Sequence, residues 1–289
     1  IDTAKHTDDK FFPRWLAEFL PIAKAAGKTD FTMYGEAWYE TTTDLVRYAV
    51  KSRLMSLLDF PSRTTIATFA AGSIASNGAQ LLNIAKYDDL YNLGGTKDGV
   101  IRNAYNLTTF IGNHDEGRAN SAIATKTAAT GPTLVEKVNL GNAILFLMRG
   151  SPVVYYGDEI GMPGANDPDC RRMMRFDQGI QSNKDVSVAG KSFPGLTEKE
   201  REMRTIIAQL IHFRNTHLAL TYGDMEVSSL GDDLLIIKRK YFGEIVYAVF
   251  NRSKENKTIE LSFSEVANFA KIAKGSPYLG QVGAVQTFN

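Results

Sequence analysis

Three apolar segments of this 289-residue chain each end in carboxylic acids. In FTMYGEAW the apolar run ends at Glu36. LTTFIGNHD ends with Asp115, and VVYYGDE ends with Asp158 and Glu159. Asp2 lies in the opening segment IDTAKH. Two carboxyl groups in one pocket can cleave a glycosidic bond if one stays protonated as the acid and the other is ionised to attack the anomeric carbon. Repulsion between the two raises one pKa, which favours this division of roles.

Each of these residues also has a purely structural interpretation. An Asp or Asn directly after a strand often caps the next helix, and a single His114 is more often structural than catalytic. Asp2 and His6 have the spacing of a metal pair on a helix. The whole chain has only four histidines and no His-x-His motif, so a metal hydrolase is disfavoured. We interpret the remaining histidines and the single cysteine, Cys170, as structural.

The elements that must position these acids alternate along the chain. Apolar runs predict strands at FTMYG, MSLLDF, LTTFIG and SPVVYYG. Apolar spacing predicts helices over 11–26, 44–53, 64–86 and 134–148, and a last helix that begins with a capping box at Thr197 and Glu200. Alternation of this kind predicts a parallel sheet, in which the carboxyl ends of the strands meet on one face. The acids are therefore expected to share a pocket.

After about Gly223 the pattern changes. DLLIIKRKY, EIVYAVFN and KTIELSF predict strands separated by turn residues, and together a small antiparallel β-domain. The net charge of +1 and the absence of a basic stripe disfavour nucleic acid as a partner. The sequence has no run of about 18 apolar residues, so no membrane insertion is predicted.

The four motifs IDTAKH, GEAW, FIGNHD and YYGDEIGM, in this order, resemble the later signature blocks of the α-amylase family, glycoside hydrolase family 13. The resemblance implies an α/β fold: the C-terminal half of a TIM (β/α)8 barrel over residues 1–222, from the end of strand 4 to helix 8. It implies a C-terminal all-β domain over residues 223–289. The implied activity is retaining cleavage at α-glucosidic bonds of starch, glycogen or malto-oligosaccharides through a covalent glycosyl-enzyme intermediate.

The resemblance also implies roles for the acids. Asp2 matches the nucleophile, Glu36 the general acid/base, and Asp115 the third carboxylate, which binds hydroxyls of the distorted sugar ring. Asp158 and Glu159 match acids that are mostly structural in the family. An apolar strand below each catalytic acid would hold it in place.

Five further residues match positions that contact substrate in the family. His114 matches a histidine that hydrogen-bonds the same sugar as Asp115, and Lys5 and His6 match a pair on the leaving-group side. Arg118 resembles an arginine near the sugar subsite. Trp38 could stack on a sugar or simply pack against the protein, and the sequence leaves both readings open.

The resemblance places the family's earlier strands, and the arginine two residues before the nucleophile, upstream of this sequence. It therefore implies that the chain is part of a longer enzyme and has weak activity or none by itself. No cofactor is required for the chemistry. A structural calcium is common in the family, and the backbone of His6 matches a frequent ligand. Polymeric starch as substrate suggests an extracellular or periplasmic enzyme.

Other functions are compatible with parts of this pattern. The same acids serve α-glucosidases and transglycosylases, and a non-catalytic relative would use the barrel only for binding or assembly. A third alternative is starch binding by the C-terminal β-domain. Its aromatic residues Tyr241, Phe242 and Tyr278 are few, and we interpret them as packing residues.

Overall fold

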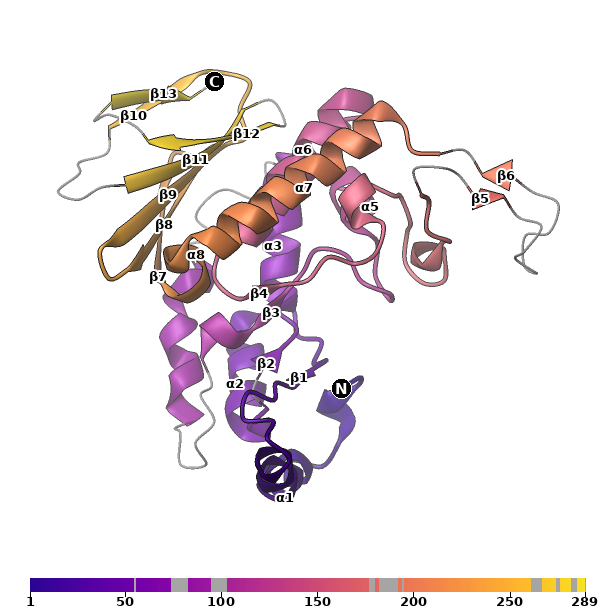
Figure 1. Cartoon of the computed structure of the whole chain (residues 1–289), viewed down its shortest axis with the longest axis vertical. Coiled ribbons are helices and arrows are strands. Elements are labelled where there is room, and N and C mark those ends of the chain that lie inside the picture. The colour runs from indigo at the N-terminus through magenta and orange to yellow at the C-terminus, as the bar shows by residue number, and fades with distance from the viewer. Residues whose placement is uncertain are drawn as a thin grey trace.

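The computed structural model describes residues 1–54, 56–73, 83–94, 103–176, 180–181, 192–193, 195–260, 267–273, 276–281 and 285–288. Figure 1 shows the N-terminal α/β part, with the N-terminus beside β1, and a β-sheet in the C-terminal part. None of the helices in these ranges combines the length and apolar character that crossing a membrane requires.

A row of short parallel strands forms the centre of the α/β part. The strands are β1 (Tyr34–Gly35), β2 (Ser56–Leu57), β3 (Thr108–Thr109) and β4 (Ser151–Pro152). β1 pairs with β2 and β3 with β4, both in parallel, and a parallel bridge between Leu58 and Thr108 joins the two pairs. The predicted parallel arrangement is confirmed, although each hydrogen-bonded ladder covers only two residues.

Helices follow the strands, as the alternation predicts. The α-helices are α1 (Phe11–Ala25), α2 (Thr42–Ser52), α3 (Phe60–Ala71), α5 (Ala119–Ala124), α6 (Gly131–Leu147), α7 (Glu198–Thr216) and α8 (Leu218–Tyr222). Short 3-10 helices cover Ala4–His6, Asp88–Gly94, Ala104–Asn106, Asp158–Ile160 and Asp169–Arg171. The capping box at Thr197 and Glu200 is present at the start of α7.

The helix predicted over 64–86 differs from the structure. Its part within α3 begins earlier, at Phe60, because Asp59 caps the helix by accepting the Ser62 N–H at 3.1 Å. α3 ends at Ala71 because Gly72 adopts a left-handed conformation, with φ of 73°. The predicted continuation over 74–82 lies outside the described residues, and residues 83–86 are helical, as predicted.

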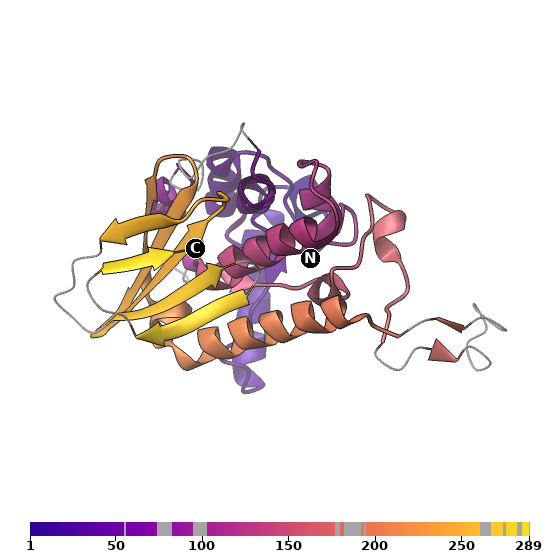
Figure 2. The same cartoon turned by 90° about the horizontal axis from the view of Figure 1, so that it is seen from above.

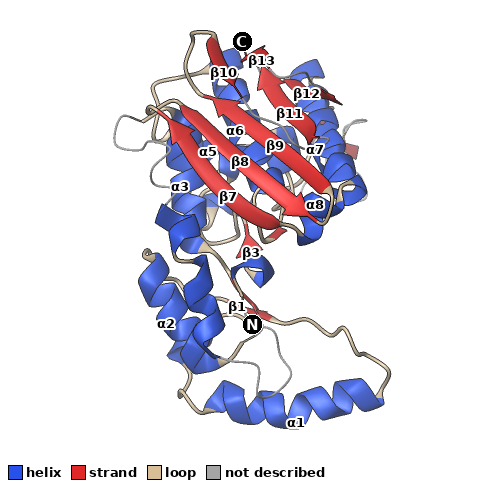
Figure 3. Ribbon diagram, turned by 90° about the vertical axis from the view of Figure 1, so that its left-hand side faces the viewer, coloured by secondary structure: helices blue, strands red, loops and turns tan. Residues whose placement is uncertain are grey.

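The C-terminal strands form a five-stranded sheet in the order β12-β11-β9-β8-β7 (Figure 3). Its members are β7 (Asp224–Leu230), β8 (Leu234–Tyr241), β9 (Glu244–Asn251), β11 (Ala267–Ala273) and β12 (Ser276–Gln281). β8 pairs antiparallel with both neighbours, as predicted, but β11 pairs in parallel with β9. The remaining strands form two antiparallel pairs: β10 (Lys257–Glu260) with β13 (Val285–Phe288), and β5 (Ile180–Gln181) with β6 (Ser192–Phe193).

This sheet shares its hydrophobic core with the α/β part. One continuous cluster includes Ile144 of α6, Ile207 of α7, and Leu235 and Phe250 of β8 and β9. Figure 3 shows α6 and α7 behind the sheet, and Figure 2 shows the same helices along its side. The boundary near Gly223 therefore separates two sequence patterns but does not separate two cores.

Two buried arginines bind the end of α6. Arg214 of α7 donates to the carbonyls of Phe146 and Met148 at 2.7 and 2.9 Å. Arg239 of β8 donates to the same Met148 carbonyl at 2.8 Å. These carbonyls lie where a helix has no internal donors, so cationic side chains satisfy them favourably. α6 is thus joined to α7 and to the sheet at one point.

A third buried arginine, Arg149, binds two acids. It donates to Asp59 Oδ2 at 2.8 Å and to the two oxygens of Asp88 at 2.8 and 2.7 Å. Burial lowers the pKa of Arg149, but the charges of Asp59 and Asp88 more than offset this and raise it overall. Since Asp59 also caps α3, this charged cluster fixes the helix that follows β2.

Candidate active site

Asp2 and Glu36 lie side by side at the start of the strand row. Ile1 donates its amino group to the Tyr34 carbonyl at 2.8 Å, and the Glu36 N–H donates to the Ile1 carbonyl at 2.7 Å. This is the bonding pattern of a parallel strand pair, so the opening segment extends the row next to β1. The Thr3 N–H then donates to Glu36 Oε2 at 3.1 Å, which orients that carboxyl group.

The two acids have opposite pKa shifts. Burial raises the pKa of Glu36, and a hydrogen bond shared with Asp2 and the charges of Asp2 and Asp115 raise it further. The same hydrogen bond to Glu36 lowers the pKa of Asp2, and the Thr3 N–H and the charge of His114 contribute in the same direction. These shifts favour the proton on Glu36 over Asp2, which is the direction that acid catalysis with a carboxylate nucleophile requires.

Asp115 is held by an arginine that sequence reasoning did not single out. Arg171 bonds to Asp115 Oδ1 at 3.0 Å and to Asp167 Oδ1 at 2.9 Å. It also donates to the His114 carbonyl at 2.8 Å. His114 Nε2 lies 3.3 Å from the other oxygen of Asp115. The spacing of Asp167 and Arg171, four residues apart, is a weak sequence signal for an ion pair, but nothing in it points to Asp115.

These residues surround a cavity of about 280 Å³. Polar and apolar side chains from all the strand ends contribute to its wall, which is lined by Ile1, Asp2, Tyr34, Glu36, Leu58, Phe110, Gly112, Asn113, His114, Val153 and Tyr155. The structure thus brings Asp2, Glu36 and His114 into one cavity, with Asp115 next to His114. A few convergent polar groups in an otherwise apolar pocket are typical of a small-molecule site.

Lys5 and Trp38 contact each other but are not among the residues that line the cavity. Lys5 donates to the Trp38 carbonyl at 2.8 Å. The Trp38 ring stacks on Phe60, with ring centroids 5.2 Å apart, and its Nε1 donates to Glu40 at 2.7 Å. Trp38 is still 38% exposed. One face of the ring therefore packs against Phe60, while the exposed part of the indole is accessible for stacking on a sugar.

His6 is exposed at the end of the short helix that follows Asp2. Within the described ranges, no three His, Cys, Asp or Glu side chains come together in a way that could hold a metal ion. A calcium ligand at the His6 backbone stays a prediction.

Arg118 does not have the placement that sequence reasoning expected. Its side chain is completely buried, so it has no surface with which to contact a sugar directly. The guanidinium lies 4.6 Å from the ring centroids of both Tyr155 and Tyr156 and donates to the Tyr156 carbonyl. Since Tyr155 lines the cavity, Arg118 supports the cavity wall from behind.

Asp158 is also buried below this region. Its Oδ1 accepts the Ala119 N–H at 3.3 Å and lies 3.9 Å from Arg118 Nη1. Burial raises its pKa to about 7, and the Ala119 N–H and Arg118 only partly offset that rise. This placement agrees with a structural role for Asp158.

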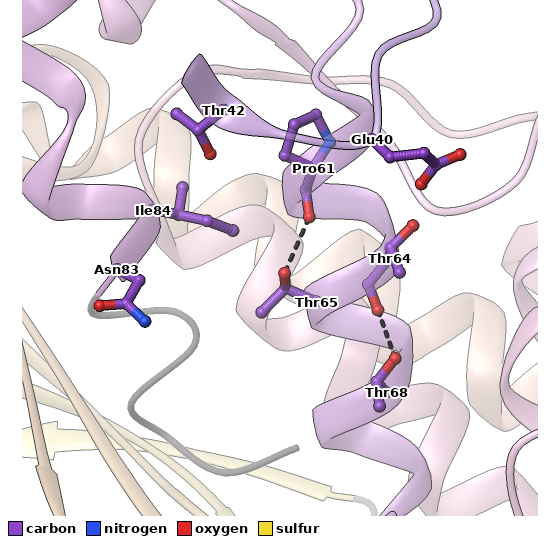
Figure 4. Close-up of a pocket in the computed structure, with 8 residues that line it drawn as sticks. All are labelled: Glu40, Thr42, Pro61, Thr64, Thr65, Thr68, Asn83 and Ile84. Carbon is purple, nitrogen blue, oxygen red and sulfur yellow. Dashed lines mark hydrogen bonds between the residues drawn. The ribbon is translucent and has the colours of Figure 1, made fainter. Parts of the chain in front are cut away.

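A second cavity, of about 310 Å³, lies along α3 and is lined by Glu40, Thr42, Pro61, Thr64, Thr65, Thr68, Asn83 and Ile84 (Figure 4). Thr65 and Thr68 donate their hydroxyls to the backbone carbonyls of Pro61 and Thr64. None of the predicted site residues lines this cavity. The hydroxyls of Thr65 and Thr68 are already used within α3, and we assign no site to this cavity.

Comparison with known proteins gives a consistent result. Residues 5–223 match the family model for the alpha amylase catalytic domain. An alpha-amylase of Streptomyces lividans is 38% identical over 177 residues, which are 60% of this chain and 18% of that protein. A cyclomaltodextrinase of Thermoanaerobacter pseudethanolicus is 27% identical over 265 residues, which are 91% of this chain and 38% of that protein.

The fold is also similar to solved structures. An alpha-amylase from Geobacillus thermoleovorans, solved in complex with acarbose, superimposes with a TM-score of 0.67 at 22% identity. The match covers 90% of this chain and 49% of that one. This chain therefore spans about half of the solved structure and less than half of the two relatives above.

Proposed function

The chain belongs to the α-amylase family, and on that basis we propose that it carries the catalytic acids of a retaining glycosidase. The substrate would be α-glucosidic bonds of starch, glycogen or malto-oligosaccharides. The observation that carries the proposal is the placement of Asp2 and Glu36 in one cavity with His114, where the Thr3 N–H orients the Glu36 carboxyl group. The pKa of Glu36 is shifted up and that of Asp2 down, in keeping with this placement. A retaining mechanism implies a separation of about 5 Å between the two carboxyl groups, whereas inverting enzymes have roughly 6.5–9.5 Å.

In the proposed reaction, Glu36 gives its proton to the glycosidic oxygen while Asp2 attacks the anomeric carbon. The bond to the leaving sugar breaks and a glycosyl ester forms on Asp2. The deprotonated Glu36 then takes a proton from water, which attacks the same carbon and releases Asp2. Asp115 and His114 would hold the hydroxyls of the distorted ring, and Lys5, His6 and Trp38 would line the leaving-group side.

The wider predictions from the sequence are part of the same proposal. The parallel row would be an arc of a (β/α)8 barrel whose other strands come from a longer chain. The isolated 289-residue chain would then be a slow catalyst, because Asp2 and its strand lie at the edge of the row. Calcium binding and an extracellular or periplasmic location are further proposals. Transfer to a sugar acceptor in place of water remains the alternative outcome of the same chemistry.

A trapping experiment tests the proposal without requiring fast turnover. An activated 5-fluoro-α-glucosyl fluoride forms a long-lived ester on the nucleophile of a retaining α-glucosidase, and peptide mass spectrometry locates the ester. We expect the label on Asp2. Asp2→Asn should abolish labelling, whereas Asp9→Asn, which alters an exposed acid paired with Lys51, should not. A label on another residue, or no label on the wild-type chain, would contradict the assignment.

A further inference from the structure

The segment that follows β3 carries His114 and Asp115, and a mostly buried arginine of α3 bonds to it at two points. This arginine, Arg63, lies in the first turn of α3. Its Nε donates to the Ile111 carbonyl at 2.8 Å, and its Nη1 forms an ion pair with Glu116 Oε2. Ile111 comes before the two site residues and Glu116 comes directly after them. Arg63 therefore grips the segment on both sides of the residues that the proposed reaction uses.

The ion pair between Arg63 and Glu116 is largely shielded from water. The two side chains are only 12% and 14% exposed. Burial lowers the pKa of Arg63 and raises the pKa of Glu116, and the charge of each partner opposes the shift of the other. Salt screens a pair in such surroundings much less than an exposed one, and loss of one partner leaves a charge without compensation. The contact can therefore hold the segment in one position.

Within the segment, Asn113 connects the ion pair to the third carboxylate. Its Oδ1 accepts the N–H groups of both Asp115 and Glu116, at 3.1 and 2.7 Å. The start of the segment is packed tightly, because a Cβ on Gly112 would lie 2.4 Å from Asp158 Oδ2. The backbone from Gly112 to Glu116 thus has little freedom to adjust locally. A displacement of Glu116 therefore displaces Asp115 as well.

The other contacts of Asp115 are more exposed to water. Arg171 bonds to its carboxylate, but the Arg171 side chain is 48% exposed. The Asp167 N–H donates to the Asp115 carbonyl at 3.0 Å. Solvent screens the charge of Arg171 more than that of Arg63, so the contact from α3 is expected to be the stronger of the two.

We propose that Arg63 is a positioning residue for the reaction, which holds segment 111–116 so that His114 and Asp115 face the bound sugar. The roles of His114 and Asp115 in this inference rest on the proposed function. Contacts with the distorted ring count most in the transition state, so displacement of the segment lowers the rate of the chemical step more than substrate affinity. A misplacement of about 1 Å commonly costs on the order of 100-fold in rate.

The trapping reagent described above measures this effect. Its rate of ester formation reports the chemical step, and the final labelled fraction counts the folded sites. We expect Arg63→Met to lower the labelling rate at saturating reagent by about 10–100-fold, with a labelled fraction close to that of the wild type. Arg63→Lys keeps the charge but has a single nitrogen for the two contacts, so it should restore only part of the rate.

Two further variants test the specificity of this effect. Glu116→Gln breaks the ion pair but keeps the bond from Arg63 to Ile111, so it should lose less rate than Arg63→Met. Arg175→Met breaks an arginine–glutamate pair of comparable burial, with Glu200 of α7. It contacts no residue of segment 111–116 among the contacts described, and the labelling rate should stay unchanged.

Hydrogen exchange of the peptide that spans residues 111–116 gives a second readout, which needs no turnover. We expect faster exchange of this peptide in Arg63→Met than in the wild type. An unchanged labelling rate or unchanged exchange in Arg63→Met would overturn the inference. So would a lower labelled fraction with a normal rate per labelled site, because Arg63 would then be needed only for folding. If the proposed function fails, the wild type takes no label on Asp2, while exchange of the peptide still responds to Arg63→Met.

Discussion

Two charged clusters in this molecule are built in contrasting ways. Around Arg149, one cation meets two buried aspartates, and three hydrogen bonds of 2.7–2.8 Å connect the groups. Around Asp2 and Glu36, two acids share one hydrogen bond, and no arginine or lysine is paired with either of them among the described residues. The first arrangement gives each buried aspartate a cationic partner and fixes a helix. The second leaves two acids without a cationic side chain, and there the burial of Glu36 and its hydrogen bond with Asp2 shift the two pKa values in opposite directions.

The largest expected effect comes from breaking the paired cluster. Arg149→Met leaves Asp59 and Asp88 buried without a counter-ion, and this should lower the free energy of unfolding by about 3–5 kcal/mol. Urea unfolding measures the change. Arg47→Met removes an arginine that is 80% exposed and paired with Asp44, and should change stability by less than about 1 kcal/mol. Equal losses of unfolding free energy in both variants would mean that the buried ion pairs of Arg149 contribute no more to stability than the exposed pair of Arg47.

Removing the proton donor Glu36 from the Asp2–Glu36 pair should lower the catalytic rate and leave the stability of the fold nearly unchanged. Glu36→Gln keeps the size of the side chain but cannot transfer a proton, and kcat on maltoheptaose should fall by about 10²–10⁴-fold. The thermal midpoint should stay close to that of the wild type. Glu18→Gln, on the exposed side of α1, serves as the matched control. A Glu36→Gln variant of wild-type rate would show that another group is the acid.

The pH dependence of kcat/KM tests the opposite pKa shifts of Asp2 and Glu36. Activity requires Asp2 ionised and Glu36 protonated, so kcat/KM should rise with pH through the lowered pKa of Asp2 and fall through the raised pKa of Glu36. Asp115 helps to keep the proton on Glu36, so Asp115→Asn should move the basic limb to lower pH. The profile is measured with initial rates across the pH range. If the basic limb does not shift, the charge of Asp115 does not raise the pKa of Glu36.

The smallest expected effect separates two neighbouring arginines of nearly equal exposure. Arg171 bonds to Asp115, whereas Arg172 bonds only to Asp169 among the acids in the described ranges. Arg171→Gln should lower kcat/KM roughly fivefold, about 1 kcal/mol, because the third carboxylate loses a half-exposed partner. Arg172→Gln should stay within about twofold. Equal losses of kcat/KM in the two variants would indicate that activity depends on the segment that carries both arginines and not on the contact of Arg171 with Asp115.

The residues that sequence reasoning found best are those whose roles depend on local pattern. Glu36 and His114 come together because each follows a short strand and parallel strands end on one face, and the opening segment brings Asp2 beside them by pairing with Tyr34 and Glu36. Thr197 and Glu200 cap α7 through contacts within four residues. Such features need only neighbouring residues to specify them.

Features that depend on distant partners were missed. Arg118 belongs to the expected motif, but its burial is set by Tyr155 and Tyr156, almost forty residues away in the sequence. The contact of Arg171 with Asp115 spans 56 residues. The parallel pairing of β11 with β9 requires a crossover that no local turn signal predicts. The length of α3 was also overestimated, because apolar spacing continues past Gly72 while the backbone does not.

The core that α6 shares with the C-terminal sheet sets an order for folding during synthesis. Arg239, which binds the end of α6, follows its partner Leu147 by 92 residues. When α6 leaves the ribosome, the strands that cover its apolar face have not yet been made. The α/β part must therefore wait, with that face exposed, until β8 and β9 emerge, and during this interval the nascent chain depends most on chaperones.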